Sequence, residues 1–206
     1  MAIPTAAALT ACGNESKNFA GTDGQTAAIR MPAAAEIIVL GMGWLWGPEK
    51  RMAALPGVVD VVSGYAGGNY EDPSYRKLFT SEERENVRNH AEVVRVTFDS
   101  KETSVRQILA GFWENHDPTQ GDRQGNDVGS NYRSAIFYTS SEQRNAALTS
   151  RDVYQGALSA GGYGKITTEI ASLEVFYPAE DNHQDYLAKN PNGYCGLGGT
   201  GVKFPL

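Results

Sequence analysis

A strand, a glycine-rich turn and a helix start follow one another in Glu36-Ile37-Ile38-Val39-Leu40-Gly41-Met42-Gly43-Trp44-Leu45-Trp46-Gly47-Pro48. The apolar run Glu36–Leu40 is typical of a buried strand, and Pro48 favours the first turn of a helix over Gly47–Ala54. Position 44 therefore lies at a helix N-terminus, where free N–H groups and the helix dipole favour an anion and lower the pKa of a thiol. The position suits a thiolate, and the chain has the indole of Trp44 there.

Beyond this stretch, strands and helices are mixed without a regular βαβ repeat. Ser104 and Ser140 each precede a helical pattern and have Gln three residues later, which is the spacing of a capping box. We expect an α+β fold: a single two-layer domain in which helices cover one face of a mixed β-sheet with a ferredoxin-like core, followed by a long glycine-rich C-terminal tail. The expected strands are 36–40, 58–63, 92–98, 133–138, 166–170 and 174–177, and the expected helices are 47–54, 105–116, 140–160 and 180–190.

Composition excludes some classes of function. The chain has 206 residues, of which 41% are hydrophobic, and this is enough for one sizeable core. A net charge of −6 lacks the basic footprint of a nucleic-acid binder. No apolar run approaches the ~20 residues of a transmembrane helix. We expect a monomer that binds no nucleic acid and has no transmembrane segment.

The two cysteines, Cys12 and Cys195, are too few for a disulfide framework. Leu9-Thr10-Ala11-Cys12 matches the bacterial lipobox, but no Lys or Arg precedes it and Ile3–Leu9 is short for a signal peptide. A truncated or mis-started signal would explain both departures. Residues 1–34 are accordingly interpreted as a truncated lipoprotein signal with a disordered tether, or as a tether alone. A bacterial location is expected, either cytoplasmic or attached to the envelope through lipid on Cys12.

Residues 35–206 resemble the A-type methionine sulfoxide reductases, the peptide-methionine (S)-S-oxide reductases. Met42–Gly47 is similar to the family signature Gly-Cys-Phe-Trp-Gly, with Trp44 in place of the nucleophilic Cys and Leu45 in place of Phe. The other matching blocks, in the family's order, are 55–58, 64–68, 90–92, 112–118, 124–134, 166–170, 176–184 and 189–195.

The resemblance implies a mechanism in which a thiolate attacks the sulfoxide sulfur while a general acid protonates the oxygen. It implies that Glu92 is this acid, a carboxyl kept protonated by an apolar pocket. Tyr65 and Tyr132 match the tyrosines whose hydroxyls hydrogen-bond the sulfoxide oxygen, and phenols stay protonated at neutral pH. No cofactor or metal is implied.

The resemblance also assigns substrate contacts. Asp127 would orient the substrate's backbone N–H, and Trp46, with Leu45 beside it, would form the wall of a pocket for the S-methyl group. Cys195 matches the resolving thiol, which forms a disulfide with the oxidised nucleophile and here has no cysteine at Trp44 to pair with. A second tail cysteine, present in some relatives, would fall at Lys203.

Local sequence alone leaves an alternative open at each of these positions. Glu92 would be an ordinary strand carboxylate, Tyr65 and Tyr132 half-buried packing residues, Asp127 a turn residue and Trp46 a core aromatic. The three histidines have no metal-ligand spacing, and we interpret all of them as structural or as supports for neighbouring site residues: His90, His116 and His183.

Two classes of function remain. The first is a reductase that repairs the S epimer of methionine sulfoxide, free or in proteins, with a thioredoxin-type reductant; Trp44 would then reflect mutation or decoding, and activity is expected to be lost or strongly impaired. The second is a pseudoenzyme that binds methionine sulfoxide or a thioether without reducing it, with Trp44 and Trp46 as one aromatic wall. The charged segment 78–89, longer than in the family, is expected to alter substrate preference.

Overall fold

A computed structural model describes residues 32–80, 88–193 and 198–205 of the chain. The chain divides into two units, 1–30 and 31–206, and every described residue belongs to the second. The predictions for Cys12, for Cys195 and for the segment before residue 32 fall outside the described residues, as does the part of the charged segment at 81–87.

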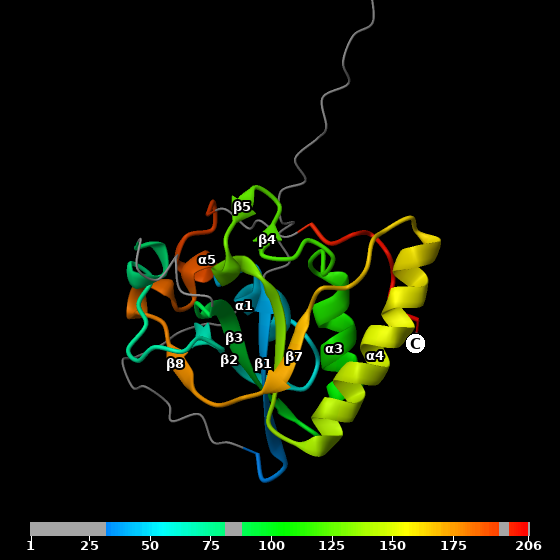
Figure 1. Cartoon of the computed structure of the whole chain (residues 1–206). Helices are drawn as coiled ribbons and strands as arrows, with labels where there is room; N and C mark the ends of the chain where they lie inside the picture. The colour runs from blue at the N-terminus through cyan, green and yellow to red at the C-terminus, as the bar shows by residue number, and fades with distance from the viewer. Residues whose placement is uncertain (1–31, 81–87, 194–197, 206) are drawn as a thin grey trace, which may run out of the picture. The chain divides into compact units, whose positions relative to one another are not determined.

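A six-stranded mixed sheet forms the centre of the second unit, in the order β7-β6-β1-β3-β2-β8 (Figure 1). Neighbouring strands are antiparallel except β6 and β7, which are parallel. A separate two-stranded hairpin is made by β4 and β5. The strands are β1 (Ala35–Met42), β2 (Val58–Ala66), β3 (Ala91–Asp99), β4 (Arg123–Gln124), β5 (Asp127–Val128), β6 (Ser134–Tyr138), β7 (Glu169–Ser172) and β8 (Phe176–Pro178).

Helices cover one face of this sheet, and the long helices α3 and α4 lie side by side against it (Figure 1). The helices are α1 (Trp46–Ala53), α3 (Val105–Glu114), α4 (Ser141–Ala160) and α5 (Tyr186–Lys189), with short 3-10 turns at Lys77–Phe79, Ser130–Tyr132 and Asp181–His183. The expected α+β fold with helices on one face of a mixed sheet is confirmed. The core on this face includes Ile38, Leu40, Met52, Val94, Val96, Phe98, Ile108, Leu109, Phe112, Trp113, Ile136, Tyr154 and Leu158.

The opposite face of the sheet has its own apolar cluster. Val39, Val93 and Phe137 are buried there and pack against Leu173 and Phe176. Leu173 directly follows β7, and Phe176 is the first residue of β8. The chain that connects these two edge strands thus packs on this face of the sheet.

Both predicted helix caps are present. The Ser104 side chain accepts a hydrogen bond from the Gln107 N–H, and the Gln107 side chain accepts one from the Ser104 N–H at 3.0 Å. Ser140 accepts in the same way from the Gln143 N–H. These bonds satisfy N–H groups that a helix start leaves without partners, so local sequence fixes where both helices begin.

Two predicted elements differ in the structure. The strand expected at 166–170 begins only at Glu169, and the helix expected at 180–190 is split into the turn Asp181–His183 and α5. The split lies at Asp185, which has a left-handed backbone with φ of 51°. The preceding Gln184 is extended and bonds Ser63 on β2 through both its amide groups, so a long-range contact overrides the local helical pattern.

Candidate active site

The predicted site residues that the structure describes, all of them except Cys195, lie at one end of the sheet, where β1 ends and β3 begins. Glu92, the second residue of β3, is paired directly with Tyr65 on β2. The turn after β1 uses Gly43 with φ of 93°, and a Cβ on Gly43 would overlap the Gln124 side chain. Helix α1 begins at Trp46, so position 44 lies just before the helix N-terminus, close to the predicted place.

Glu92 is a buried carboxyl that stays protonated at neutral pH. Its side chain is only 3% exposed. Burial raises the pKa of Glu92 to about 8, and the nearby negative charge of Asp127 acts in the same direction. Asn131 Nδ2 donates to Glu92 Oε1 at 3.4 Å and partly opposes this rise. A protonated carboxyl in this environment has a proton to give, as a general acid requires.

Trp44 projects toward the β4–β5 hairpin. Its indole N–H donates a hydrogen bond to Asp127 Oδ2, with Nε1 and Oδ2 2.5 Å apart. The ring also lies beside Gly125 in the hairpin turn, where a Cβ would be 3.5 Å from the ring edge. Trp44, at the position that resembles the family's nucleophile, is therefore in contact with the carboxylate for which the resemblance implies a role in substrate orientation.

The tyrosines of the site have different surroundings. Tyr65 is fully buried, and its hydroxyl donates to Glu180 Oε2 at 2.7 Å. Burial and this bond raise the pKa of Tyr65 above its ordinary value. Burial, followed by the charge of Glu92, raises the pKa of Tyr132 to about 12. Both phenols keep their protons throughout the physiological range.

Tyr75 is a site residue to which the sequence analysis gave no role. Burial raises its pKa, and the next causes are the charges of Glu92 and Asp127, which places Tyr75 in the same electrostatic environment as Tyr132. The Glu180 carboxylate accepts the Tyr75 backbone N–H at 3.0 Å. With 37% of its surface exposed, Tyr75 lies at the edge of the site.

Trp46 and Leu45 lie on the α5 side of the site. The Trp46 ring stacks on Tyr186 with centroids 3.8 Å apart, and its indole N–H donates to His183 Nδ1 at 3.1 Å. Leu45 is 2% exposed and belongs to a small apolar cluster with Tyr65. Because the acceptor nitrogen of His183 must lack a proton, the contact requires a neutral imidazole.

Glu49, in the first turn of α1, links that helix to α5. Its Oε1 accepts the backbone N–H of Asp185 at 3.1 Å, and burial raises the pKa of the Glu49 carboxyl. The contact holds the start of α5, and hence Tyr186, against Trp46. The sequence analysis did not single out Glu49.

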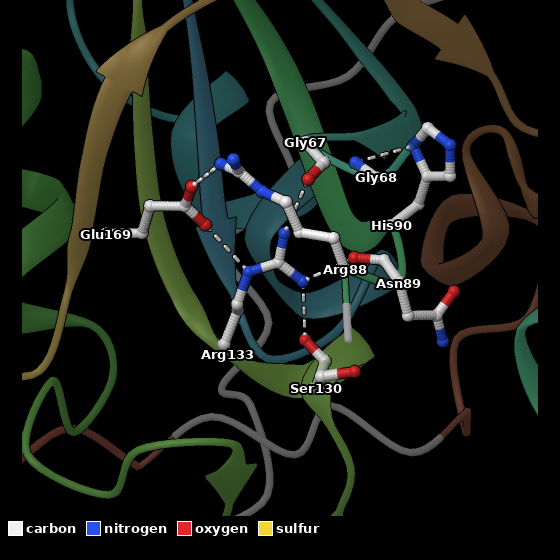
Figure 2. A network of polar contacts seen from close by, with 8 residues as sticks. All are labelled: Gly67, Gly68, Arg88, Asn89, His90, Ser130, Arg133 and Glu169. Carbon is white, nitrogen blue, oxygen red and sulfur yellow. Dashed lines mark hydrogen bonds and ion pairs between the residues drawn. The ribbon is translucent and has the colours of Figure 1, made fainter. Parts of the chain in front are cut away.

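Arg133 joins the segments that carry the site residues (Figure 2). Its Nη1 donates to the carbonyls of Asn89 and Ser130 at 2.8 and 2.7 Å, and its Nη2 donates to the carbonyl of Gly67 at 3.2 Å. Its Nε donates to Glu169 Oε2 at 2.9 Å. The carbonyls of Gly67, Asn89 and Ser130 lie within three residues of Tyr65, Glu92 and Tyr132, respectively, so one guanidinium fixes three parts of the site.

The histidines are held by ordinary hydrogen bonds. His90 Nδ1 accepts the Gly68 N–H, and its Nε2 donates to the Tyr70 carbonyl. His116 is fully buried between the Phe112 carbonyl and the Ser134 hydroxyl, and burial lowers its pKa to about 4. Within the described parts of the chain, no group of three or more His, Cys, Asp or Glu residues could hold a metal ion. The same residues include no helix long and apolar enough to cross a membrane.

Comparison with known proteins agrees with this geometry. Residues 36–200 match the family model described as peptide methionine sulfoxide reductase. The chain is 53% identical to the peptide methionine sulfoxide reductase MsrA of Rhodospirillum centenum over 175 residues, which cover 85% of this chain and 78% of that protein.

Solved structures are also similar to this chain over most of its length. Methionine sulfoxide reductase A of Corynebacterium diphtheriae is 41% identical with a TM-score of 0.73, and the match covers 85% of each chain. Mxr1 of Saccharomyces cerevisiae in complex with Trx2 is 25% identical with a TM-score of 0.50, covering 78% of this chain and 91% of that one.

Proposed function

Because the chain belongs to the peptide methionine sulfoxide reductase family, we propose that its site is built to reduce the S epimer of methionine sulfoxide, free or in proteins, and that Trp44 prevents turnover. The observation that carries the proposal is Glu92, a carboxyl whose proton is retained by burial on β3, next to the end of β1 that leads into α1. A sulfoxide reductase needs a proton donor at the point where a nucleophile attacks, and this chain keeps the donor.

The chemistry that fits this site begins with a thiolate at position 44. That thiolate attacks the sulfoxide sulfur while Glu92 gives its proton to the oxygen, which passes to the thiol as a sulfenic acid and leaves methionine. The Cys195 thiol then forms a disulfide with that sulfur and releases water, and a dithiol reductant restores both thiols. An indole has no lone pair available for the first attack, so Trp44 stops the sequence before any bond forms.

We assign the remaining groups by their surroundings. Tyr132 and Tyr75 share the electrostatic environment of Glu92 and are the proposed donors to the sulfoxide oxygen. The Tyr65 hydroxyl already donates to Glu180, so we do not assign it to the sulfoxide oxygen. Trp46 is the proposed methyl-pocket wall and Asp127 the proposed acceptor for the substrate's N–H. The similarity to the Mxr1 complex with Trx2 supports a thioredoxin-type reductant for this chain.

The decisive experiment replaces Trp44. We expect Trp44→Cys to reduce N-acetyl-methionine-S-sulfoxide in a thioredoxin-coupled assay, and the R epimer to remain unreduced. Trp44→Ser is the matched control, because Ser has the size of Cys without an ionisable thiol at neutral pH, and it should be as inactive as the parent chain. Peptide mapping after one turnover should find the thiol introduced at position 44 joined to Cys195.

Either of two results would contradict the proposal. Turnover by the chain with Trp44 would mean that another group is the nucleophile, with Cys195 the first to test. A folded but inactive Trp44→Cys protein would mean that Leu45 or the charged segment 78–89 has already dismantled the site.

A further inference from the structure

The Asp127 carboxylate is already hydrogen-bonded to a side chain of the same protein, the indole of Trp44. Trp44 Nε1 and Asp127 Oδ2 are hydrogen-bonded at 2.5 Å across 83 residues of sequence. An indole nitrogen only donates, as does a peptide N–H, and both present one hydrogen along a fixed direction. Trp44 therefore makes the contact that the proposed function gives to the substrate's backbone N–H.

The hairpin around Asp127 accommodates the ring. Gly125 has a left-handed backbone with φ of 61°. A Cβ added to Gly125 would lie 3.5 Å from the Trp44 ring, so the ring packs directly against the turn. Trp44 also packs, partly buried, against the core cluster on the helix-covered face of the sheet. The Trp44 ring thus contacts a glycine turn and apolar side chains, and its N–H donates to a carboxylate.

We propose that Asp127 and the Gly125 turn form a subsite for a planar N–H donor, and that Trp44 fills it from within and closes the site to methionine sulfoxide. A tethered ligand competes at a high effective concentration, so an external ligand must first displace the ring. The role of Asp127 toward substrate rests on the proposed function, whereas filling of the subsite by the indole does not.

The test removes the Trp44 ring by substitution and then adds free indole as a ligand. Trp44 is partly buried, and replacing such an aromatic with a small residue leaves a hollow that a molecule of matching shape can fill. We expect Trp44→Ala to bind free indole in ligand-observed NMR or calorimetry, and the parent chain to show no such binding. Benzofuran has the same shape with an oxygen in place of the N–H, and it should bind about tenfold more weakly because it cannot donate to Asp127.

Two controls isolate the subsite. In Trp44→Ala with Asp127→Ala, the preference for indole over benzofuran should disappear. N-acetyl-methionine-S-sulfoxide methylamide should displace indole from Trp44→Ala and should not bind the parent chain. Trp44→Gly serves as the second variant if Trp44→Ala does not fold, as judged by circular dichroism.

Equal binding of indole to the parent chain and the folded variant would overturn the proposal, as would equal affinity for indole and benzofuran. These measurements do not depend on catalysis. If Trp44→Cys proves inactive while Trp44→Ala binds indole through Asp127, the proposed reductase function fails and the subsite stands. Binding of indole without displacement by the sulfoxide would overturn the part of the proposal in which Trp44 closes the site to substrate.

Discussion

Replacing Glu92 with Gln should make the stability of the protein less sensitive to pH. The folded pKa of about 8 lies about 3.5 above the ordinary value of 4.5, and at about 1.4 kcal/mol for each pH unit this is about 5 kcal/mol. Below pH 4.5 Glu92 is protonated in both the folded and unfolded chains, so its ionisation does not change the free energy of unfolding. Between pH 4.5 and 8 only the unfolded chain releases the proton, so the contribution of Glu92 to stability falls as pH rises.

Glu92→Gln is neutral in both states and lacks this loss. The free energy of unfolding of the variant minus that of the parent chain should therefore rise by about 1.4 kcal/mol per pH unit across this window and level off above pH 8. Other titrating groups, including Glu49, are common to both proteins and cancel in the difference.

Urea unfolding of both proteins at each whole pH from 5 to 9 measures the difference, with tryptophan fluorescence and circular dichroism required to give the same transition. A difference that stays flat with pH would refute the argument, because it would mean that Glu92 has an ordinary pKa in the folded protein. Such a result would also remove the proton donor on which the proposed chemistry depends.

Two further substitutions test the framework of the site. Arg133→Lys should lower the free energy of unfolding by ~2–4 kcal/mol in urea titrations, because an ammonium cannot bind three carbonyls and Glu169 together. The more exposed Arg88 also pairs with Glu169, and Arg88→Lys should change the free energy of unfolding by ~1 kcal/mol or less. Similar effects of the two substitutions would contradict the network. Gly43→Ala should cost ~2 kcal/mol or more by the same measurement, since it strains a backbone with φ of 93° and displaces Gln124; an unchanged midpoint would show that the turn has another conformation.

Sequence alone predicts the elements whose signals are local. The capping pairs at Ser104 and Ser140 fix helix starts, and the stripe Ile108, Leu109, Phe112 and Trp113 is buried as its spacing indicates. The interval 180–190 shows where such signals fail. Its pattern is helical, but Gln184 bonds β2 across 121 residues, and no local pattern reports a contact of that range.

The site residues also divide into those that local sequence identifies and those whose role depends on long-range contacts. Glu92 and Trp44 stand in recognisable blocks, and Trp44 lies just before the N-terminus of α1, close to the predicted place. Tyr75 lies among turn residues and resembles an exposed aromatic, although it neighbours the charged segment 78–89. Arg133 directly follows Tyr132 and looks like any surface cation, because its role depends on carbonyls that only tertiary structure brings together.

The Arg133 network also has a consequence for folding, because it can be completed only after distant parts of the chain have come together. Its hydrogen-bond partners lie 66, 44 and 36 residues away at Gly67, Asn89 and Glu169, so four strands must be in place before the guanidinium has its full set of acceptors. Closing chain segments of this length is slow compared with forming a helix or a hairpin. The site should accordingly be the last region to become ordered during refolding, and a fragment that ends before β7 should form helices without an assembled site.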